Sequence, residues 1–186
     1  MILKIVQTGY PVLRQRAREL TREEILSDAT QVLIQSMFET MRDAPGVGLA
    51  APQIGMPLQL AVIEDRPEFL SKMPPEDLAL RARTEVAPHV IVNPRLTAEG
   101  AETAEFFEGC LSLPGYTAVV PRALAVRVDA MNERAEPVVI RARGWYARIL
   151  QHEIDHLHGT LYIDRMQSRS FSTRENFMRF HEARKD

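Results

Sequence analysis

The sequence predicts an α+β fold, in which strands and helices occupy separate parts of one chain. Two long helical patterns, at 28–44 and 144–158, lie on either side of a stretch that is rich in strand-like runs. Those runs are 58–65, 89–96, 117–130 and 136–143. An alternating α/β fold would instead place a helix after each strand.

The N-terminal third carries helix-start signals. Residues 11–17, PVLRQRA, read as an extended arm. Thr21 and Glu24 fit a capping box, which predicts a short helical turn. Ser27 is a second N-cap candidate. The apolar residues after it recur at helical spacing, namely Ile34, Met37, Phe38 and Met41. Pro45 ends this amphipathic helix.

Local signals also predict the elements in the rest of the chain. Pro121 predicts an edge or a bulge in the third strand. Residues 66–88 are charged and proline-rich, and we expect a surface loop with one helical turn. Gly159 suits the C′ position of the second long helix. TLYID (160–164) reads as a strand, and the tail from about Ser170 as a third helix carrying Phe177 and Phe180.

Composition limits the classes of protein. The 186 residues fit a single domain, residues 1–186, with 45% hydrophobic and 26% charged residues. A net charge of −2 gives no general basis for nucleic-acid or anionic-membrane binding. No apolar run approaches the roughly 20 residues that span a bilayer, and no targeting peptide is apparent. The single Cys110 excludes an internal disulfide, so we expect a cytoplasmic location.

A candidate catalytic motif lies in the second long helix. His152 and His156 are four residues apart and share one helix face, close enough to bind one metal ion. Glu153 completes H-E-x-x-H, in which the carboxylate can act as general base toward a metal-bound water. Trp145 and Ile149 place the histidines on an apolar stripe, which favours a ligand role over solvated surface histidines.

A third protein ligand is needed for a catalytic site with one open position. No histidine follows at the metzincin spacing, and Cys110, in EGCLS, is the remaining soft ligand. His158 points elsewhere on the helix, and His89 and His181 belong to no pattern. A zinc peptidase and a non-catalytic domain with structural zinc are the alternatives. The missing downstream ligand argues against the first, and the lack of a fourth ligand against the second.

Three motifs in order resemble those of the peptide deformylases: GVGLAAPQ (46–53), EGCLS (108–112) and QHEIDHLHG (151–159). GWYARILQHEIDHLHGTLYIDRM (144–166) and VPRALAV (120–126) look like the subgroup shared by some bacteria and organelles. The resemblance implies antiparallel sheets packed around a central metal-binding helix. It also implies hydrolysis of the formyl group from N-formyl-methionyl nascent peptides, which releases formate and a free amine.

The resemblance also implies roles for individual residues. The Gln53 amide and the Leu111 N–H would stabilise the oxyanion while Glu153 moves the proton. Further positions would contact the peptide and its methionine, namely Val47, Gly48, Phe106, Gly109, Trp145 and Ile149. Gly46 and Gly48 would let the peptide backbone approach closely. The implied native ion is Fe²⁺, with Zn²⁺, Ni²⁺ or Co²⁺ as substitutes at one ion per chain.

Roles are also predicted for residues beside the motifs and in the C-terminal tail. Glu108 and Arg122 are predicted to pair and orient Cys110. Arg148 is predicted to line the pocket rim with its charged end in water, whereas Asp155 fits a solvated or a supporting role equally. Basic residues recur in the tail at Arg169, Arg174, Arg179, Arg184 and Lys185. Transient ribosome contact is one reading, and a solvated helix face is the other.

Overall fold

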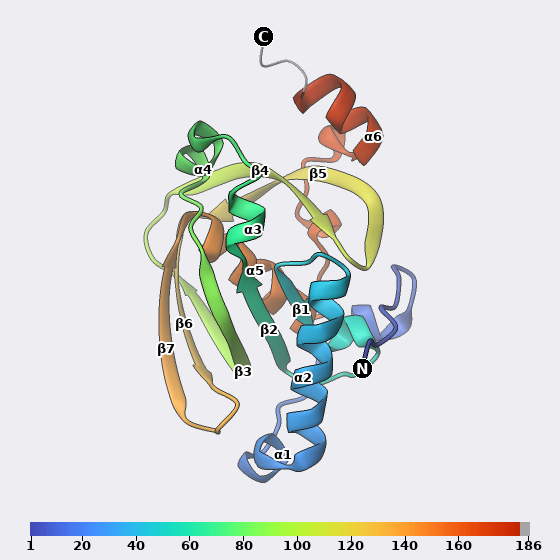
Figure 1. Cartoon of the computed structure of the whole chain (residues 1–186), viewed down its shortest axis with the longest axis vertical. Coiled ribbons are helices and arrows are strands. Elements are labelled where there is room, and N and C mark those ends of the chain that lie inside the picture. The colour runs from blue at the N-terminus through green and yellow to red at the C-terminus, as the bar shows by residue number, and fades with distance from the viewer. Residues whose placement is uncertain (183–186) are drawn as a thin grey trace.

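The computed structural model describes residues 1–182, and its strands form two antiparallel sheets. The larger sheet contains, in spatial order, β1 (Gly48–Ala50), β2 (Leu60–Asp65), β3 (Val86–Ala98), β6 (Ala125–Met131) and β7 (Pro137–Arg143). The smaller sheet contains β4 (Thr103–Cys110), β5 (Leu113–Ala123) and β8 (Ser172–Thr173). The predicted α+β class and the antiparallel sheets are confirmed (Figure 1).

The helices lie around these sheets (Figure 1). They are α1 (Arg22–Leu26), α2 (Asp28–Asp43), α3 (Pro67–Leu70), α4 (Pro75–Arg81), α5 (Gly144–Leu157) and α6 (Arg174–Phe177), which a π-helical turn (Met178–Glu182) extends. In Figure 1, α5 lies behind the strands, α2 runs along the β1 edge, and α6 lies beyond β5. Within residues 1–182, no helix combines the length and apolar composition needed to cross a bilayer.

Both faces of the larger sheet are buried, which explains the unbroken apolar run of β2. Leu60 and Val62 pack with Met37 of α2 in one core cluster. Ala61 and Ile63 point to the opposite face and pack with Ile149 of α5 in another. Successive strand residues point to opposite faces, so a strand covered on both sides has no polar alternation. The same packing fixes α5, and with it the predicted ligands, against the sheet.

The helix starts agree with the predictions. The Thr21 hydroxyl accepts from the Glu24 N–H, and the Glu24 carboxylate accepts from the Thr21 N–H, which completes the capping box. Ser27 caps α2 through the Thr30 N–H. Each such cap satisfies helix N–H groups that would otherwise lack an acceptor.

Several predicted elements are wrong in type or extent. Residues 11–14 and 162–164 form 3₁₀ turns instead of an extended arm and a strand. The Asp164 carboxylate accepts from the Leu161 N–H, so the chain turns within TLYID. The run 117–130 is two strands, because the chain leaves the smaller sheet after Ala123 and enters the larger one at Ala125.

The segments around the site also differ from expectation. β1 and β4 carry the site and were not expected as strands, and residues 66–88 hold two short helices instead of one turn. The C-terminal helix is present but starts at Arg174, because Ser172 and Thr173 pair with β5 first. Pro121 has no N–H to donate, and it faces Glu105 of β4. On the other edge of β5, the pairing with β8 is confined to Tyr116 and Thr117, so no strand requires a hydrogen bond from residue 121 there.

Candidate active site

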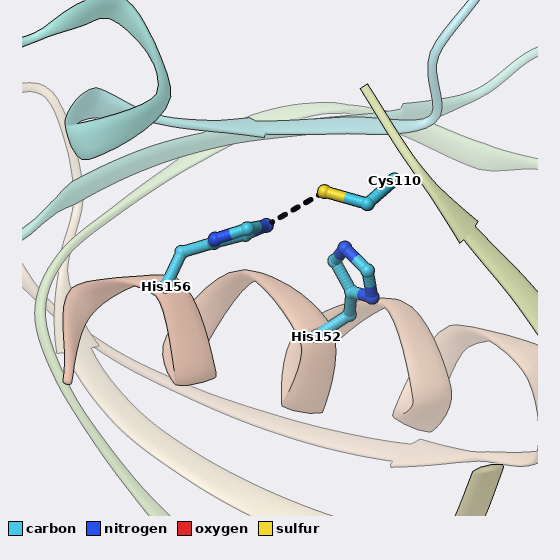
Figure 2. Close-up of side chains that lie close together, drawn as sticks. All are labelled: Cys110, His152 and His156. Atoms are coloured by element: carbon cyan, nitrogen blue, oxygen red, sulfur yellow. Dashed lines mark hydrogen bonds between the residues drawn. The ribbon is translucent and has the colours of Figure 1, made fainter. Parts of the chain in front are cut away.

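Cys110, His152 and His156 bring their ligand atoms together where the end of β4 meets α5. The three ligand atoms lie within 4.8 Å of one another, and Cys110 Sγ is 3.3 Å from His156 Nε2. Figure 2 shows both imidazoles rising from neighbouring turns of α5 toward the thiol. Ligands of one tetrahedral ion lie roughly 3.5 Å apart, given bond lengths of about 2.0–2.3 Å. Small side-chain rotations would therefore let these three hold one ion.

Glu108 lies behind the ligands and fixes His152. Its carboxylate is 3.0 Å from His152 Nδ1, which leaves Nε2 of the ring for an ion. The same carboxylate accepts two hydrogen bonds from Arg122, at 2.9 and 3.0 Å. Burial raises the pKa of Glu108, but the hydrogen bonds from His152 and Arg122 outweigh it and hold that pKa well below its ordinary value. The predicted contact between Glu108 and Arg122 is therefore present.

The electrostatics around the two imidazoles favour a cation. Burial keeps the pKa of His156 well below its ordinary value, so its ring is neutral, as a metal ligand must be. Burial also lowers the pKa of His152, but hydrogen bonds to Cys110 and Glu108 raise it well above its ordinary value. The thiol and the carboxylate thus stabilise positive charge at His152, and this donor set fits a divalent ion.

Asp155 takes the supporting role of its two predicted alternatives. It is buried, and it pairs with Arg122 on one side and with Arg165 on the other, the latter at 2.7 and 2.8 Å. Arg122 therefore bridges Asp155 and Glu108 behind the metal ligands. His158, by contrast, is exposed, as expected.

The prediction for Arg148 is correct in one part and wrong in the other: the residue lines the cavity, but its charged end is buried. Its guanidinium does not reach water, because the residue is only 3% exposed. It donates to Glu108 Oε1 at 2.6 Å and to the backbone carbonyls of Ala104 and Val120. A buried charge is costly without a paired opposite charge. Glu108, 40 residues earlier in the chain, supplies that charge.

Glu153 lies at the cavity wall, with one carboxylate oxygen free. The residue is 4% exposed, and its Oε2 is buried without a hydrogen-bond partner among the described residues. Burial raises the pKa of Glu153 to about 7. A Cβ at Gly48 would lie 2.3 Å from Glu153 Oε1. Gly48 is therefore needed to make room for Glu153, whereas the resemblance implied only room for a peptide backbone.

Gln53 is held rigidly beside the thiol. Its Oε1 accepts from the Ala50 N–H at 2.9 Å, and its Nε2 donates to Ser112 Oγ at 3.4 Å and to Cys110 Sγ at 3.6 Å. Gly55, with φ of 83°, ends the short 3₁₀ turn that carries it. The side-chain amide of Gln53 is therefore buried, hydrogen-bonded and fixed in orientation.

These residues surround a cavity of about 820 Å³. Most of the predicted site residues line it, namely Val47, Gly48, Gln53, Gly109, Cys110, Leu111, Trp145, Ile149, His152 and Glu153. Phe106 is not among the lining residues, whereas Phe107 is. Side chains alternate along β4, so Phe106 packs edge-on against Trp145, at 6.2 Å between ring centroids.

Sequence reasoning missed part of the cavity wall. Phe69, Arg83, Tyr116, Arg174 and Phe177 also line the cavity. Phe69 and Arg83 belong to the segment that was expected to be a surface loop. Arg83 pairs with the buried Asp65 at 2.7 and 2.8 Å, and this ion pair holds the end of the segment against β2. An aromatic residue in a charged loop was the available signal.

Comparisons with known proteins agree with this geometry. Residues 2–172 match the family model described as polypeptide deformylase. The chain is 48% identical over 172 residues to peptide deformylase 1A, chloroplastic, of Solanum lycopersicum, covering 92% of this chain and 62% of that protein. It is 47% identical over 173 residues to peptide deformylase 1A, chloroplastic/mitochondrial, of Arabidopsis thaliana, covering 93% and 64%. It therefore spans less than two thirds of the length of these plant relatives.

Solved structures give the same result. The chain matches a class I type b peptide deformylase from Acinetobacter baumannii, with Met-Ala-Ser bound, at a TM-score of 0.79 and 31% identity. The match covers 89% of this chain and 99% of that one. With the family model matched over nearly the whole sequence, this chain belongs to the peptide deformylase family.

Proposed function

We propose that this protein is a metal-dependent hydrolase that removes the formyl group from N-formylmethionyl peptides. The observation that carries the proposal is the three-ligand cluster of Cys110, His152 and His156 beside a cavity that Glu153 lines. Among the described residues, the cluster contains no fourth protein ligand. Structural zinc sites normally have four, so this arrangement favours a catalytic site with one open position.

Glu153 is the candidate acid–base residue. When bound by Cys110, His152 and His156, a divalent ion would supply Lewis acidity and lower the pKa of the attacking water. The free Oε2 of Glu153 would accept a proton from the attacking water and donate it to the leaving amine. A pKa near 7 suits a carboxyl group that must accept and donate a proton in one cycle.

Two neutral donors stabilise the oxyanion in this proposal. Gln53 Nε2 is aimed at the ligand cluster, because its own Oε1 is fixed by the Ala50 N–H. The Leu111 N–H, at the turn directly after Cys110, is the second donor. Both are positioned before substrate arrives, which is the property that makes such donors effective. Neutral donors also add no charge that would retain the formate product.

The peptide would bind between two sheet edges. β1 is an edge strand of the larger sheet and β4 an edge strand of the smaller one. Val47 and Gly48 line the cavity on one side and Gly109 on the other. An extended peptide can add to such an edge through main-chain hydrogen bonds. The bound Met-Ala-Ser of the A. baumannii relative is a peptide of this kind, with methionine first.

The methionine side chain would occupy the apolar part of the cavity. Val47, Trp145 and Ile149 line the cavity, the last two from the α5 face that carries His152. Phe106 acts indirectly in this proposal, because it supports the Trp145 ring from behind. Arg81 and Arg83 also lie over that ring, at 5.1 and 5.2 Å from its centroid.

The remaining assignments follow the family resemblance. We propose Fe²⁺ as the native ion, one per chain, with Zn²⁺, Ni²⁺ or Co²⁺ as substitutes, since thiolate and imidazole suit all four. The substrates are nascent peptides, met in the cytoplasm or in an organelle like that of the plant relatives. Residues 1–186 act as one domain. Transient ribosome contact is proposed only for the tail, of which Arg184 and Lys185 lie outside the described residues.

A pair of tripeptides tests this function. The metal-loaded protein should hydrolyse formyl-Met-Ala-Ser and leave acetyl-Met-Ala-Ser intact, with formate release as the readout. Loss of the formyl group with intact internal amide bonds supports a deformylase. Cleavage of internal bonds would identify a zinc peptidase, and no hydrolysis in a metal-loaded protein would identify a structural site.

A further inference from the structure

The cavity extends beyond the metal ligands to the C-terminal segment. Arg174 and Phe177, from α6, line the same cavity as Cys110 and His152. Arg174 was singled out in the sequence as part of a basic tail and has no role in the chemistry proposed above. Because Arg174 lines the cavity, it can act on a bound substrate, a role that neither solvation nor ribosome contact describes.

The C-terminal segment is attached to the site wall by several contacts. Thr173 pairs with Tyr116 and Ser172 with Thr117, which joins β8 to β5. The Phe171 ring stacks on the Tyr116 ring at 5.2 Å, with 4° between the ring planes. These contacts fix the start of α6 relative to the cavity.

A second aromatic contact fixes the other end of α6. Phe177 packs on Phe107 of β4, with 4.5 Å between the ring centroids. The Thr173 hydroxyl also caps α6 through the Asn176 N–H. Arg174 lies between the β8 pairing and the contact of Phe177 with Phe107, so its backbone is held in a fixed position at the cavity wall.

Among the arginines of this wall, Arg174 is the one without a carboxylate partner within residues 1–180. Arg83 pairs with Asp65, and Arg148 pairs with Glu108. Arg174 is exposed and forms no ion pair with any residue from 1 to 180. An exposed guanidinium beside a substrate cavity attracts carboxylates that enter it.

The strand register gives an approximate distance between Thr173, the residue before Arg174, and the predicted ligand Cys110. Thr173 pairs with Tyr116, and Leu113, three residues earlier in β5, pairs with Cys110. Two strand spacings and three residues along β5 put Thr173 about 14 Å from Cys110. An extended peptide covers that distance in about four residues. Arg174 lines the same cavity as Gly48 and Gly109, so its long side chain can reach residues that follow the methionine of a peptide bound there.

We propose that Arg174 is a specificity-determining residue that binds a carboxylate downstream of the formylmethionine. This inference rests on the proposed deformylase function. The carboxylate can come from an Asp or Glu side chain or from the C-terminus of a short peptide. Exposed ion pairs are weak, so we expect a preference of roughly two- to fivefold for Asp over Lys. The preference lies in KM, because Arg174 lies away from the reacting atoms.

The test uses the full metal-loaded chain and formyl-Met pentapeptides with amidated C-termini. Asp, Asn or Lys is placed in turn at the second, third and fourth positions, and kcat and KM are measured at low ionic strength. The neutral peptide is also compared with free and amidated C-termini, which separates the two sources of carboxylate. Arg174→Gln and Arg174→Glu are the test variants. Arg179→Gln is the matched control, because Arg179 is exposed in the same segment but stacks on Phe180 and does not line the cavity.

In the parent protein, the Asp peptide should have a lower KM than the Lys peptide. The two KM values should be equal in Arg174→Gln, and the Lys peptide should have the lower KM in Arg174→Glu. Arg179→Gln should keep the parental order, and added salt should weaken it. Equal KM values in the parent protein, or an unchanged order in Arg174→Gln, would overturn the inference while leaving the deformylase function intact. Absence of formate release from every peptide would instead overturn the proposed function itself.

Discussion

Replacing Gly48 by alanine should displace Glu153 without touching a metal ligand. A Cβ at Gly48 would lie 2.3, 2.6 and 2.7 Å from Oε1, Cδ and Cγ of Glu153. The carboxylate would have to retreat by about 1 Å to restore ordinary contact, and a misplacement of that size can cost about 100-fold in rate. Without a clash, a glycine-to-alanine change in a strand would stabilise the protein by roughly 0.4–1 kcal/mol. We therefore expect a loss in kcat near 100-fold at a normal metal content.

The assay is formate release from formyl-Met-Ala-Ser, together with metal content per chain. Gly46→Ala is the comparison, because a Cβ there would meet Leu111 Cδ1 at 2.9 Å, and that atom is the end of a flexible side chain. It should therefore lose much less activity than Gly48→Ala. A Gly48→Ala protein with a near-parental rate would refute the reasoning that the position of Glu153 governs turnover.

Two further predictions concern the layer behind the ligands and the pH dependence of stability. Glu108→Gln should weaken metal binding by about 10–100-fold, because the carboxylate that orients His152 is lost. Metal titration of the metal-free protein measures this, and an unchanged affinity would contradict the role of Glu108. Burial holds the pKa of His89 below its ordinary value, against a backbone hydrogen bond to Ala87 that raises it. In the unfolded chain the His89 imidazole takes up a proton near pH 6.5, whereas in the folded protein it does so at a lower pH. The contribution of neutral His89 to the free energy of unfolding is therefore present above about pH 6.5 and is lost as the pH falls through the lower folded-state pKa. His89→Gln should flatten this part of the pH dependence in urea unfolding, and an unchanged slope would count against it.

The metal ligands could be predicted because their pattern is local. His152 and His156 lie one helical turn apart, and an apolar stripe marked the buried face of α5. Cys110 was identified as the remaining soft ligand, and its contact with His156 agrees with that choice. The strand-like run at 58–65 was also predicted correctly, since residues 60–65 form β2.

The surroundings of the site could not be predicted, because they depend on distant partners. Arg148 is buried only because Glu108 comes to it from a strand 40 residues away. Period-two patterning in TLYID suggested a strand, but Tyr162 is buried within a 3₁₀ turn that Asp164 caps. The acidic residues of β4 concealed a strand whose inward carboxylate, Glu108, is paired with two arginines and hydrogen-bonded to His152.

The most direct test of the mechanism compares Glu153→Gln with His152→Ala. Glu153→Gln keeps the volume of the side chain and the three ligands, but it removes the base. We expect about one metal ion per chain and a loss of at least the ~10²–10⁴-fold that is typical of general acid–base catalysis. His152→Ala should lose metal and activity together. The measurement is metal content alongside formate release for both variants. A Glu153→Gln protein that retains a near-normal rate would contradict the assignment of the proton transfer to Glu153.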